Sequence, residues 1–205
     1  MTVQSNDVIA IADLLKDDDL SEAVRAALAI LQKITDRPDL HQRDPLERFI
    51  NLLLGEIAER AVYVWLARGS KEVARVQKNP GGPDPGYDLI VKGSNGRPLT
   101  VSVKSSVSVY KSEINDILDT FKLAVTQAEA RKADIHIQVY YWLEPGAQTR
   151  TTVPSISKAI IAAWAFKGDL ANVSYASYTP SERRPAPEIK LRNLRPMKDL
   201  LRHLK

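Results

Sequence analysis

The chain has 205 residues, of which 44% are hydrophobic and 26% are charged, and it contains no cysteine. This length fits one domain with at most a modest extension, and it can bury a sizeable core. The lack of cysteine excludes disulfides, thiolate zinc sites and a cysteine nucleophile. No run approaches the roughly 18 apolar residues that cross a bilayer, and aspartates occupy the N-terminal segment where a signal peptide would be basic and apolar. We therefore expect a folded cytoplasmic protein.

The formal net charge is only +4, but it is unevenly distributed along the chain. Residues 1–59 carry six Lys or Arg against twelve Asp or Glu, and residues 181–205 carry eight against three, giving −6 and +5. A basic segment on a near-neutral body favours a partner with a phosphate backbone. A solvated tail would explain the same charges, so this pattern leaves both interpretations open.

The first third of the chain shows helical patterns. We expect helices over residues 7–15, 21–34 and 45–68, and Ser21 is a suitable N-cap for the second of them. Pro45 suits the first turn of the long helix, and Gly69 suits its C-terminal end. This part of the chain is therefore predicted to be helical throughout.

The remaining chain alternates between strand and helix patterns. Short β-branched runs predict strands over residues 73–76, 87–92 and 99–103, and Ser94-Asn95-Gly96 is typical of a hairpin turn between the last two. A helix is then expected over residues 113–133, followed by strands over residues 135–143 and 158–166. A short amphipathic helix is predicted at the end from apolar residues at helical spacing: Met197, Leu200, Leu201 and Leu204.

This order of elements predicts an α/β fold in which a central mixed β-sheet is flanked by helices. We divide the chain into an N-terminal helical extension (residues 1–44), a core (residues 45–180) and a basic C-terminal segment with the short amphipathic helix (residues 181–205). Such a scaffold does not by itself indicate a function.

Strand alternation over residues 99–104 separates an apolar face from a polar one. The polar face carries Thr100, Ser102 and Lys104. Asp88 begins the neighbouring strand of the hairpin, so it is expected beside Ser102 and Lys104. A carboxylate and a lysine can therefore converge, although an aspartate in a turn and a lysine in a strand are also common surface residues.

The long helix over residues 45–68 is apolar on two opposite sides, which predicts that it is largely buried. Glu59 falls within one of these apolar stripes. Because a buried carboxylate is costly unless it is paired or bound to a metal, Glu59 needs a partner. Glu56 lies between the stripes with Arg60 four residues later, so we interpret Glu56 and Arg60 as a surface ion pair.

Five segments together resemble a known superfamily. They are Gly55-x-x-x-Glu59-x-x-Val62-x-x-x-Leu66-x-x-Gly69, Gly86-Tyr-Asp88-Leu-Ile-Val, Val101-Ser-Val-Lys104-Ser, and residues 132–143 and 159–170. In order and spacing they resemble the PD-(D/E)XK nucleases, which have a restriction-endonuclease-like core, and most of all the type II restriction endonucleases. The resemblance covers about half of the chain.

The resemblance implies a Mg²⁺ site. Asp88 would hold one or two ions with the backbone carbonyl of Val103, Glu59 would assist directly or through water, and Lys104 would orient or activate the attacking water. Mg²⁺ prefers oxygen ligands, lowers the pKa of bound water and stabilises charge on a phosphate. A lysine ammonium can also stabilise the charge that develops there.

One position departs from the family pattern. The second acidic residue of the motif is Ser102 in this chain, so the site lacks one negative charge. Some restriction enzymes of this superfamily also have Ser-x-Lys and recover the carboxylate from the following helix. Glu113 and Asp116 are candidates for that role, and Asp84 in the preceding turn is another.

Two functions remain open. The first is a Mg²⁺-dependent endodeoxyribonuclease of the type II restriction kind, acting on double-stranded DNA as a homodimer. In that enzyme the basic C-terminal segment would follow the DNA backbone, and the N-terminal helices would support dimerisation or grip DNA. The second is a degenerate protein of the same fold that binds DNA or another protein without cutting. Base-edge contacts that would set a recognition sequence cannot be located from the sequence.

Overall fold

A computed structural model of the chain describes residues 2–32, 44–77, 85–108, 113–143, 156–176 and 186–205. Its centre is a six-stranded mixed sheet in the order β1-β6-β5-β4-β3-β2. The strands are β1 (Ile9–Ala10), β2 (Val73–Arg75), β3 (Leu89–Lys92), β4 (Pro98–Ser108), β5 (Ile135–Leu143) and β6 (Ile156–Phe166). Strands β4 and β5 run parallel, and the other neighbouring strands run antiparallel.

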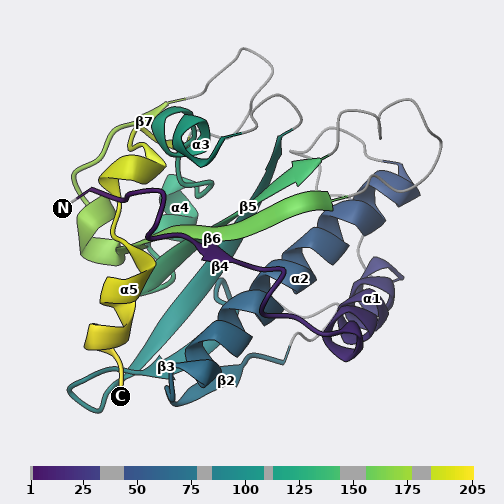
Figure 1. Cartoon of the computed structure of the whole chain (residues 1–205). Coiled ribbons are helices and arrows are strands. Elements are labelled where there is room, and N and C mark those ends of the chain that lie inside the picture. The colour runs from purple at the N-terminus through teal and green to yellow at the C-terminus, as the bar shows by residue number, and fades with distance from the viewer. Residues whose placement is uncertain (1, 33–43, 78–84, 109–112, 144–155, 177–185) are drawn as a thin grey trace.

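Helices cover both faces of this sheet. Helix α2 (Pro45–Arg68) crosses one face, and α1 (Asp17–Leu31) packs on the outer side of α2 (Figure 1). On the other face lie α3 (Ile114–Thr120) and α4 (Gln127–Ala130), which connect β4 to β5. A helical crossover is what a parallel pair of strands requires. The predicted α/β class with a central mixed sheet is confirmed.

The chain ends in a set of short elements. They are the 3₁₀ helices η2 (Lys167–Leu170), η3 (Leu191–Asn193) and η4 (Leu201–His203), the small pair β7 (Tyr175–Ala176) and β8 (Ala186–Pro187), and α5 (Met197–Leu200). The predicted C-terminal helix is thus one short α-helical turn continued by a 3₁₀ turn. Met197, Leu200 and Leu204 are buried, as their spacing predicted.

The long helix and the two central strands match their sequence patterns. Helix α2 begins at Pro45, and the Asp44 carboxylate accepts a hydrogen bond from the Glu47 backbone N–H at 2.8 Å. Gly69 follows its last residue. A proline in the first turn after an aspartate N-cap is a strong helix start. Strands β5 and β6 also confirm the expected strands over residues 135–143 and 158–166.

The N-terminal region differs from its prediction. Residues 7–15 are not helical, because Ile9 and Ala10 form strand pairs with β6. Pairing with β6 satisfies backbone groups of this segment, whereas a helix this short is only marginally stable by itself. Helix α1 begins at Asp17 rather than Ser21. The Asp19 carboxylate accepts from the Lys16 backbone N–H at 3.0 Å, and acidic side chains in a first turn stabilise the helix dipole. The part of the predicted helix beyond residue 32 lies outside the described residues.

The expected helix over residues 113–133 is also wrong in its middle. Helix α3 ends at Thr120, the chain then runs extended, and α4 begins after Thr126. The Gln138 side chain on β5 accepts a hydrogen bond from the Ala124 backbone N–H at 2.9 Å, which holds the extended segment against the sheet. A tertiary contact therefore overrides the helical propensity of this stretch.

Both ends of the chain pack onto the sheet. The Val3 backbone N–H donates to the Arg192 carbonyl at 2.8 Å. The Trp164 indole N–H on β6 donates to the Pro196 carbonyl at 2.8 Å. The segment from residue 186 onward is thus part of the core structure. In the described residues, no helix combines the length and the apolar composition needed to cross a membrane.

Candidate active site

Asp88 directly precedes β3, at the point where β4 extends beyond its pairing with β3 while it stays paired with β5. Its backbone N–H donates to the Val101 carbonyl at 2.8 Å, and one of its carboxylate oxygens accepts from the Val103 backbone N–H at 2.7 Å. The Asp88 carboxylate therefore accepts the hydrogen bond that a backbone carbonyl would have accepted if β3 had continued along β4. The structure thus brings the Asp88 carboxylate to the Val103 backbone.

The backbone carbonyl of Val103 points toward the same edge. In a strand the N–H and C=O of one residue are directed to the same side. Because the Val103 N–H meets the Asp88 carboxylate, its carbonyl faces the open edge of β4 beside Asp88. A carboxylate and a carbonyl oxygen, the ligand types that Mg²⁺ prefers, are thus close to each other.

The Lys104 side chain lies on the face of the sheet opposite to α2. Val101 and Val103 pack in the core with α2, so alternation directs Ser102 and Lys104 toward the helical crossover. There the Lys104 ammonium contacts Glu129 of α4 at 3.0 Å. The pair is part-buried, with 26% and 29% of the two side chains exposed.

Glu129 is held firmly by its own helix start. Thr126 donates to one Glu129 oxygen from its backbone N–H and its hydroxyl, both at 2.8 Å, while Lys104 binds the other oxygen. Burial disfavours the charged carboxylate, but Lys104 and the Thr126 hydrogen bonds outweigh it and lower the pKa of Glu129 to about 2. Glu129 is therefore a fixed anion beside Lys104 at any physiological pH.

The strand surface around Lys104 is polar and deeply buried. Ser102, His136 and Gln138 are all nearly inaccessible, and Ser102 and Lys104 are the register partners of His136 and Gln138 on β5. The His136 ring donates to the Ala130 carbonyl at 3.2 Å, and burial lowers its pKa, which favours the neutral ring. With its serine buried, β4 offers no acidic group next to Lys104.

Glu59 is buried on the α2 face of the sheet, as its place in an apolar stripe predicted. Only 6% of the residue is exposed, and its carboxylate lies 3.8 Å from the Arg75 guanidinium. Burial raises the pKa of Tyr141 on β5, and the negative charge of Glu59 raises it further. The contacts of Glu59 with Arg75 and Tyr141 are thus on the α2 side, whereas Lys104 meets Glu129 on the opposite side.

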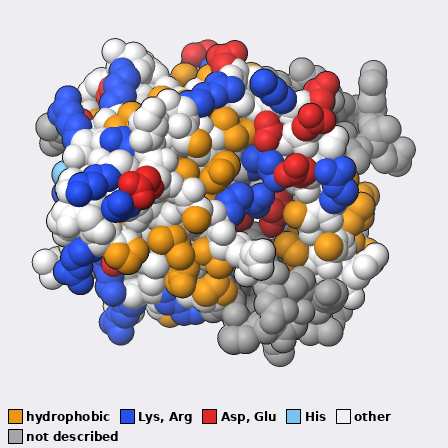
Figure 2. All heavy atoms as spheres, turned by 90° about the horizontal axis from the view of Figure 1, so that it is seen from below, with side chains coloured by type: hydrophobic (Ala, Val, Ile, Leu, Met, Phe, Trp, Pro, Cys, Tyr) orange, Lys and Arg blue, Asp and Glu red, His pale blue; other side chains and the backbone are white. Residues whose placement is uncertain are grey.

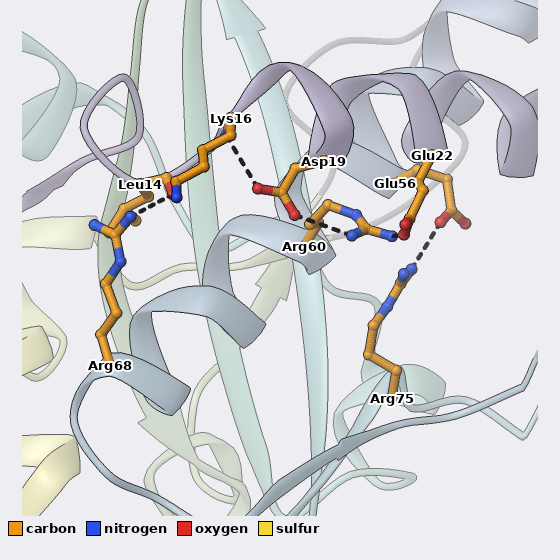
Figure 3. Close-up of polar contacts among 8 residues, drawn as sticks. All are labelled: Leu14, Lys16, Asp19, Glu22, Glu56, Arg60, Arg68 and Arg75. Atoms are coloured by element: carbon orange, nitrogen blue, oxygen red, sulfur yellow. Dashed lines mark hydrogen bonds and ion pairs between the residues drawn. The ribbon is translucent and has the colours of Figure 1, made fainter.

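The interpretation of Glu56 as a surface partner of Arg60 is wrong. Glu56 is only 2% exposed and binds Arg75 of β2 at 2.9 Å. Arg60 instead points from α2 toward α1, where it pairs with Asp19 at 3.0 Å and with Glu22 (Figure 3). The packing of α1 on α2 provides partners for Arg60 that are distant in sequence. Two buried carboxylates in one helical turn therefore share Arg75.

Among the described residues, Lys104 pairs with Glu129 rather than with Glu113 or Asp116, two of the three suggested replacements for the missing acid. Glu113 and Asp116 are exposed at the start of α3, and Asp84 lies outside the described residues. Glu129, whose carboxylate binds Lys104, was not among the predicted site residues. Its signal was present in Thr126-x-x-Glu129, the pattern of a capping box at a helix start.

The residues present fit Mg²⁺ better than a metal that needs a full protein cage. Within the described residues, no group of three or more His, Asp or Glu side chains could hold an ion. Mg²⁺ keeps several waters and is often bound by one or two carboxylates together with substrate phosphates. Asp88 and the Val103 carbonyl satisfy that modest requirement.

Two arginines of the basic C-terminal segment pair with acidic side chains elsewhere in the fold. Arg192 binds Asp119 of α3 at 2.7 Å, and Arg195 binds Asp169 at 2.6 Å while lying over the Trp164 ring. On the face drawn in Figure 2, basic side chains are spread among acidic and hydrophobic ones. These two arginines therefore stabilise the fold rather than extend from it.

No protein-family model matches the chain, and no curated protein matches it. Its function therefore has to be inferred from these residues and their geometry.

Proposed function

We propose that the protein is a Mg²⁺-dependent endonuclease that hydrolyses phosphodiester bonds of double-stranded DNA, in the manner of the PD-(D/E)XK nucleases. One observation carries the proposal. The Asp88 carboxylate meets the Val103 backbone at the edge of β4, one residue before Lys104. A carboxylate and a carbonyl, with an ammonium on the next residue of the strand, are the kinds of group that a metal-assisted attack on a phosphate needs.

The order of elements supports the same proposal. Glu59 lies on the long helix α2, Asp88 precedes the second strand of the β2-β3-β4 meander, and Lys104 lies in the third. This is the order that the resemblance implies. A homodimer, in which each copy cuts one strand, would suit a double-stranded substrate.

Each residue would have a distinct role. Asp88 and the Val103 carbonyl would hold Mg²⁺, and Glu59 would assist through water from the α2 side. The ion would supply a water of lowered pKa and stabilise charge on the phosphate. Lys104, held in place by Glu129, would orient the attacking water or neutralise the developing charge.

A second candidate is a degenerate member of the same fold that binds DNA or another protein without cutting. Ser102 in place of an acid and the ion pair between Lys104 and Glu129 favour it, because both reduce the free charge available to a metal. The two candidates differ in a single measurable property, which is metal-dependent cleavage.

Cleavage of supercoiled plasmid in Mg²⁺, with EDTA as the metal-free control, tests the proposal. Asp88→Asn and Lys104→Met should each lower the rate about 100-fold or more, since each removes a group that acts on the transition state. Asp116→Asn, an exposed carboxylate on α3, is the matched control and should cut like wild type. Salt-sensitive DNA binding without cutting would favour the degenerate protein, and no binding at low salt would refute both the nuclease and a degenerate protein that binds DNA.

A further inference from the structure

Lys132 lies across the turn that carries Asp88. Gly86, two residues before Asp88, has a φ of +82°. A Cβ atom at Gly86 would stand 2.4 Å from Cδ, 3.0 Å from Cβ and 3.3 Å from Cγ of Lys132. The lysine stem therefore rests on the bare backbone of this glycine. Because only two single bonds of about 1.5 Å each join Cδ to Nζ, the ammonium stays beside this turn.

The chain on both sides of Lys132 is fixed. Its backbone N–H donates to the Glu129 carbonyl at 2.9 Å, so the helical turn that holds Lys104 also positions Lys132. Two residues later, the Asp134 carboxylate accepts from the Thr100 N–H and hydroxyl, both at 2.9 Å. These bonds tie the segment to β4, and β4 also holds Asp88. Lys132 is thus placed relative to Asp88 by strand and helix backbone.

Lys132 is nevertheless exposed to solvent. A lysine can lay its methylene stem along the protein and keep its charge in water. Here the Lys132 stem covers the backbone of Gly86, which offers little apolar area. Hydrophobic burial therefore stabilises this position of the side chain only weakly. Under the proposed function, an ammonium beside the turn that carries Asp88 would have an electrostatic use, because it would face a bound phosphate backbone.

We propose that Lys132 binds a backbone phosphate of the DNA next to the one held at Asp88, and that Gly86, whose φ of +82° itself favours glycine, also leaves the room in which the Lys132 stem lies. This inference rests on the proposed function, and it adds a positioning residue to it. Lys132 fixes the register of the strand on the site, and Lys104 and Asp88 act on the scissile phosphate.

Binding of a fluorescein-labelled DNA duplex in EDTA, followed by anisotropy over a range of NaCl concentrations, tests the role of Lys132. Loss of one phosphate contact should lower the slope of log K against log salt by about 0.9 for B-form DNA. Lys132→Gln should show this change and weaken duplexes of different sequence alike. Lys132→Arg should keep the slope, and so should Lys16→Gln, an exposed lysine at the start of α1, which packs on α2 on the other face of the sheet.

Gly86→Ala tests the second half of the proposal. The added methyl should displace the Lys132 stem and lower the salt slope as Lys132→Gln does. Gly96→Ala is the matched control, because Gly96 also has a positive φ, of +83°, and the nearest atom to its added Cβ is Nζ of Lys205 at 3.8 Å. In the double variant the two effects should not add, because they remove one contact.

The outcomes separate this inference from the proposed function. If wild type binds DNA and Lys132→Gln binds with an unchanged slope, the phosphate contact is refuted while the nuclease stands. If Gly86→Ala lowers the slope equally with and without Lys132, the glycine argument is refuted. Binding without cleavage would refute the nuclease and leave the contact intact, and no binding by wild type would refute both.

Discussion

Glu129 connects the candidate site to the helical crossover through both of its carboxylate oxygens. One oxygen accepts from Thr126 and the other binds Lys104. The lysine is therefore held at a fixed place without an acidic neighbour on its own strand. A charge-assisted pair in a part-buried position is stronger than one on an exposed surface.

The lowered pKa of Glu129 predicts a pH-dependent contribution to stability. A carboxyl whose pKa falls from 4.5 to about 2 on folding stabilises the fold above its unfolded value, and that contribution is lost as the pH falls from about 5 to 2. Glu129→Gln should therefore lower the free energy of unfolding by roughly 2 kcal/mol at pH 7, allowing for partial exposure of the pair.

Urea unfolding at several pH values checks this prediction. Other carboxyls titrate in the same range, so the informative quantity is the difference between wild type and Glu129→Gln. That difference should shrink toward zero near pH 2. A difference that stays constant from pH 7 to pH 2 would mean that the variant perturbs packing rather than the ion pair.

Part of the candidate site followed from the sequence because its residues are local. The hairpin between Asp88 and Lys104 is set by turn residues and strand alternation, so the approach of Asp88 to β4 could be predicted. The pairing of Lys104 with Glu129 depends on where α4 packs on the sheet after the extended segment that follows α3. Arg75 between Glu56 and Glu59 likewise requires β2 to lie beside α2. Local patterns do not contain that information.

At the scale of elements, the crossover between β4 and β5 decides where Glu129 lies. Its extended middle separates α3 from α4, and Gln138 holds this middle by accepting from Ala124. The Gln138 amide also donates to the Ser106 hydroxyl at 3.2 Å and to the Val139 carbonyl at 2.7 Å. One buried side chain thus connects β4, β5 and the crossover.

Gln138→Leu should loosen the crossover while keeping a side chain of similar size. Groups left without partners cost about 1–3 kcal/mol. Hydrogen exchange should become faster over residues 121–130, with β6 unaffected in the same sample. Under the proposed function, cleavage should fall together with this protection. Unchanged exchange in the variant would show that Gln138 does not hold the segment.

Strong periodic elements could be predicted, and short ones could not. Helix α2 and strands β5 and β6 carry long patterns with clear end signals, so they were placed within one or two residues. Strand β1 has two residues and exists because β6 pairs with it. The crossover has ample helical propensity, yet a hydrogen bond from another strand keeps its middle extended. In both cases a partner distant in sequence decides the structure.

At the scale of the whole molecule, the basic C-terminal segment is a structural component. Met197 and Leu200 are completely buried, and Trp164 bonds the segment at both its backbone and its indole. Burial of side chains of this size contributes about 1.5–3 kcal/mol each. Their sum is a large part of the 5–15 kcal/mol that typically separates folded from unfolded protein.

Deletion of residues 197–205 should therefore abolish cooperative thermal unfolding, which circular dichroism would measure. Lys198→Gln with Arg202→Gln removes two charges from the same segment and leaves its buried residues in place. This charge variant should melt within a few degrees of wild type, because exposed ion pairs contribute little. A stably folded deletion variant would mean that the segment is an appendage, available to follow DNA.

The hydrogen bond between Val3 and Arg192 also fixes the order of events during synthesis. The two residues are 189 positions apart, so at about 5–20 residues per second the ribosome makes the second roughly 10–40 s after the first. Strand β1 likewise waits for β6. The pairing of β1 with β6 and the bond between Val3 and Arg192 can both form only when nearly the whole described chain has been made. Until then the candidate site residues belong to an incompletely folded chain.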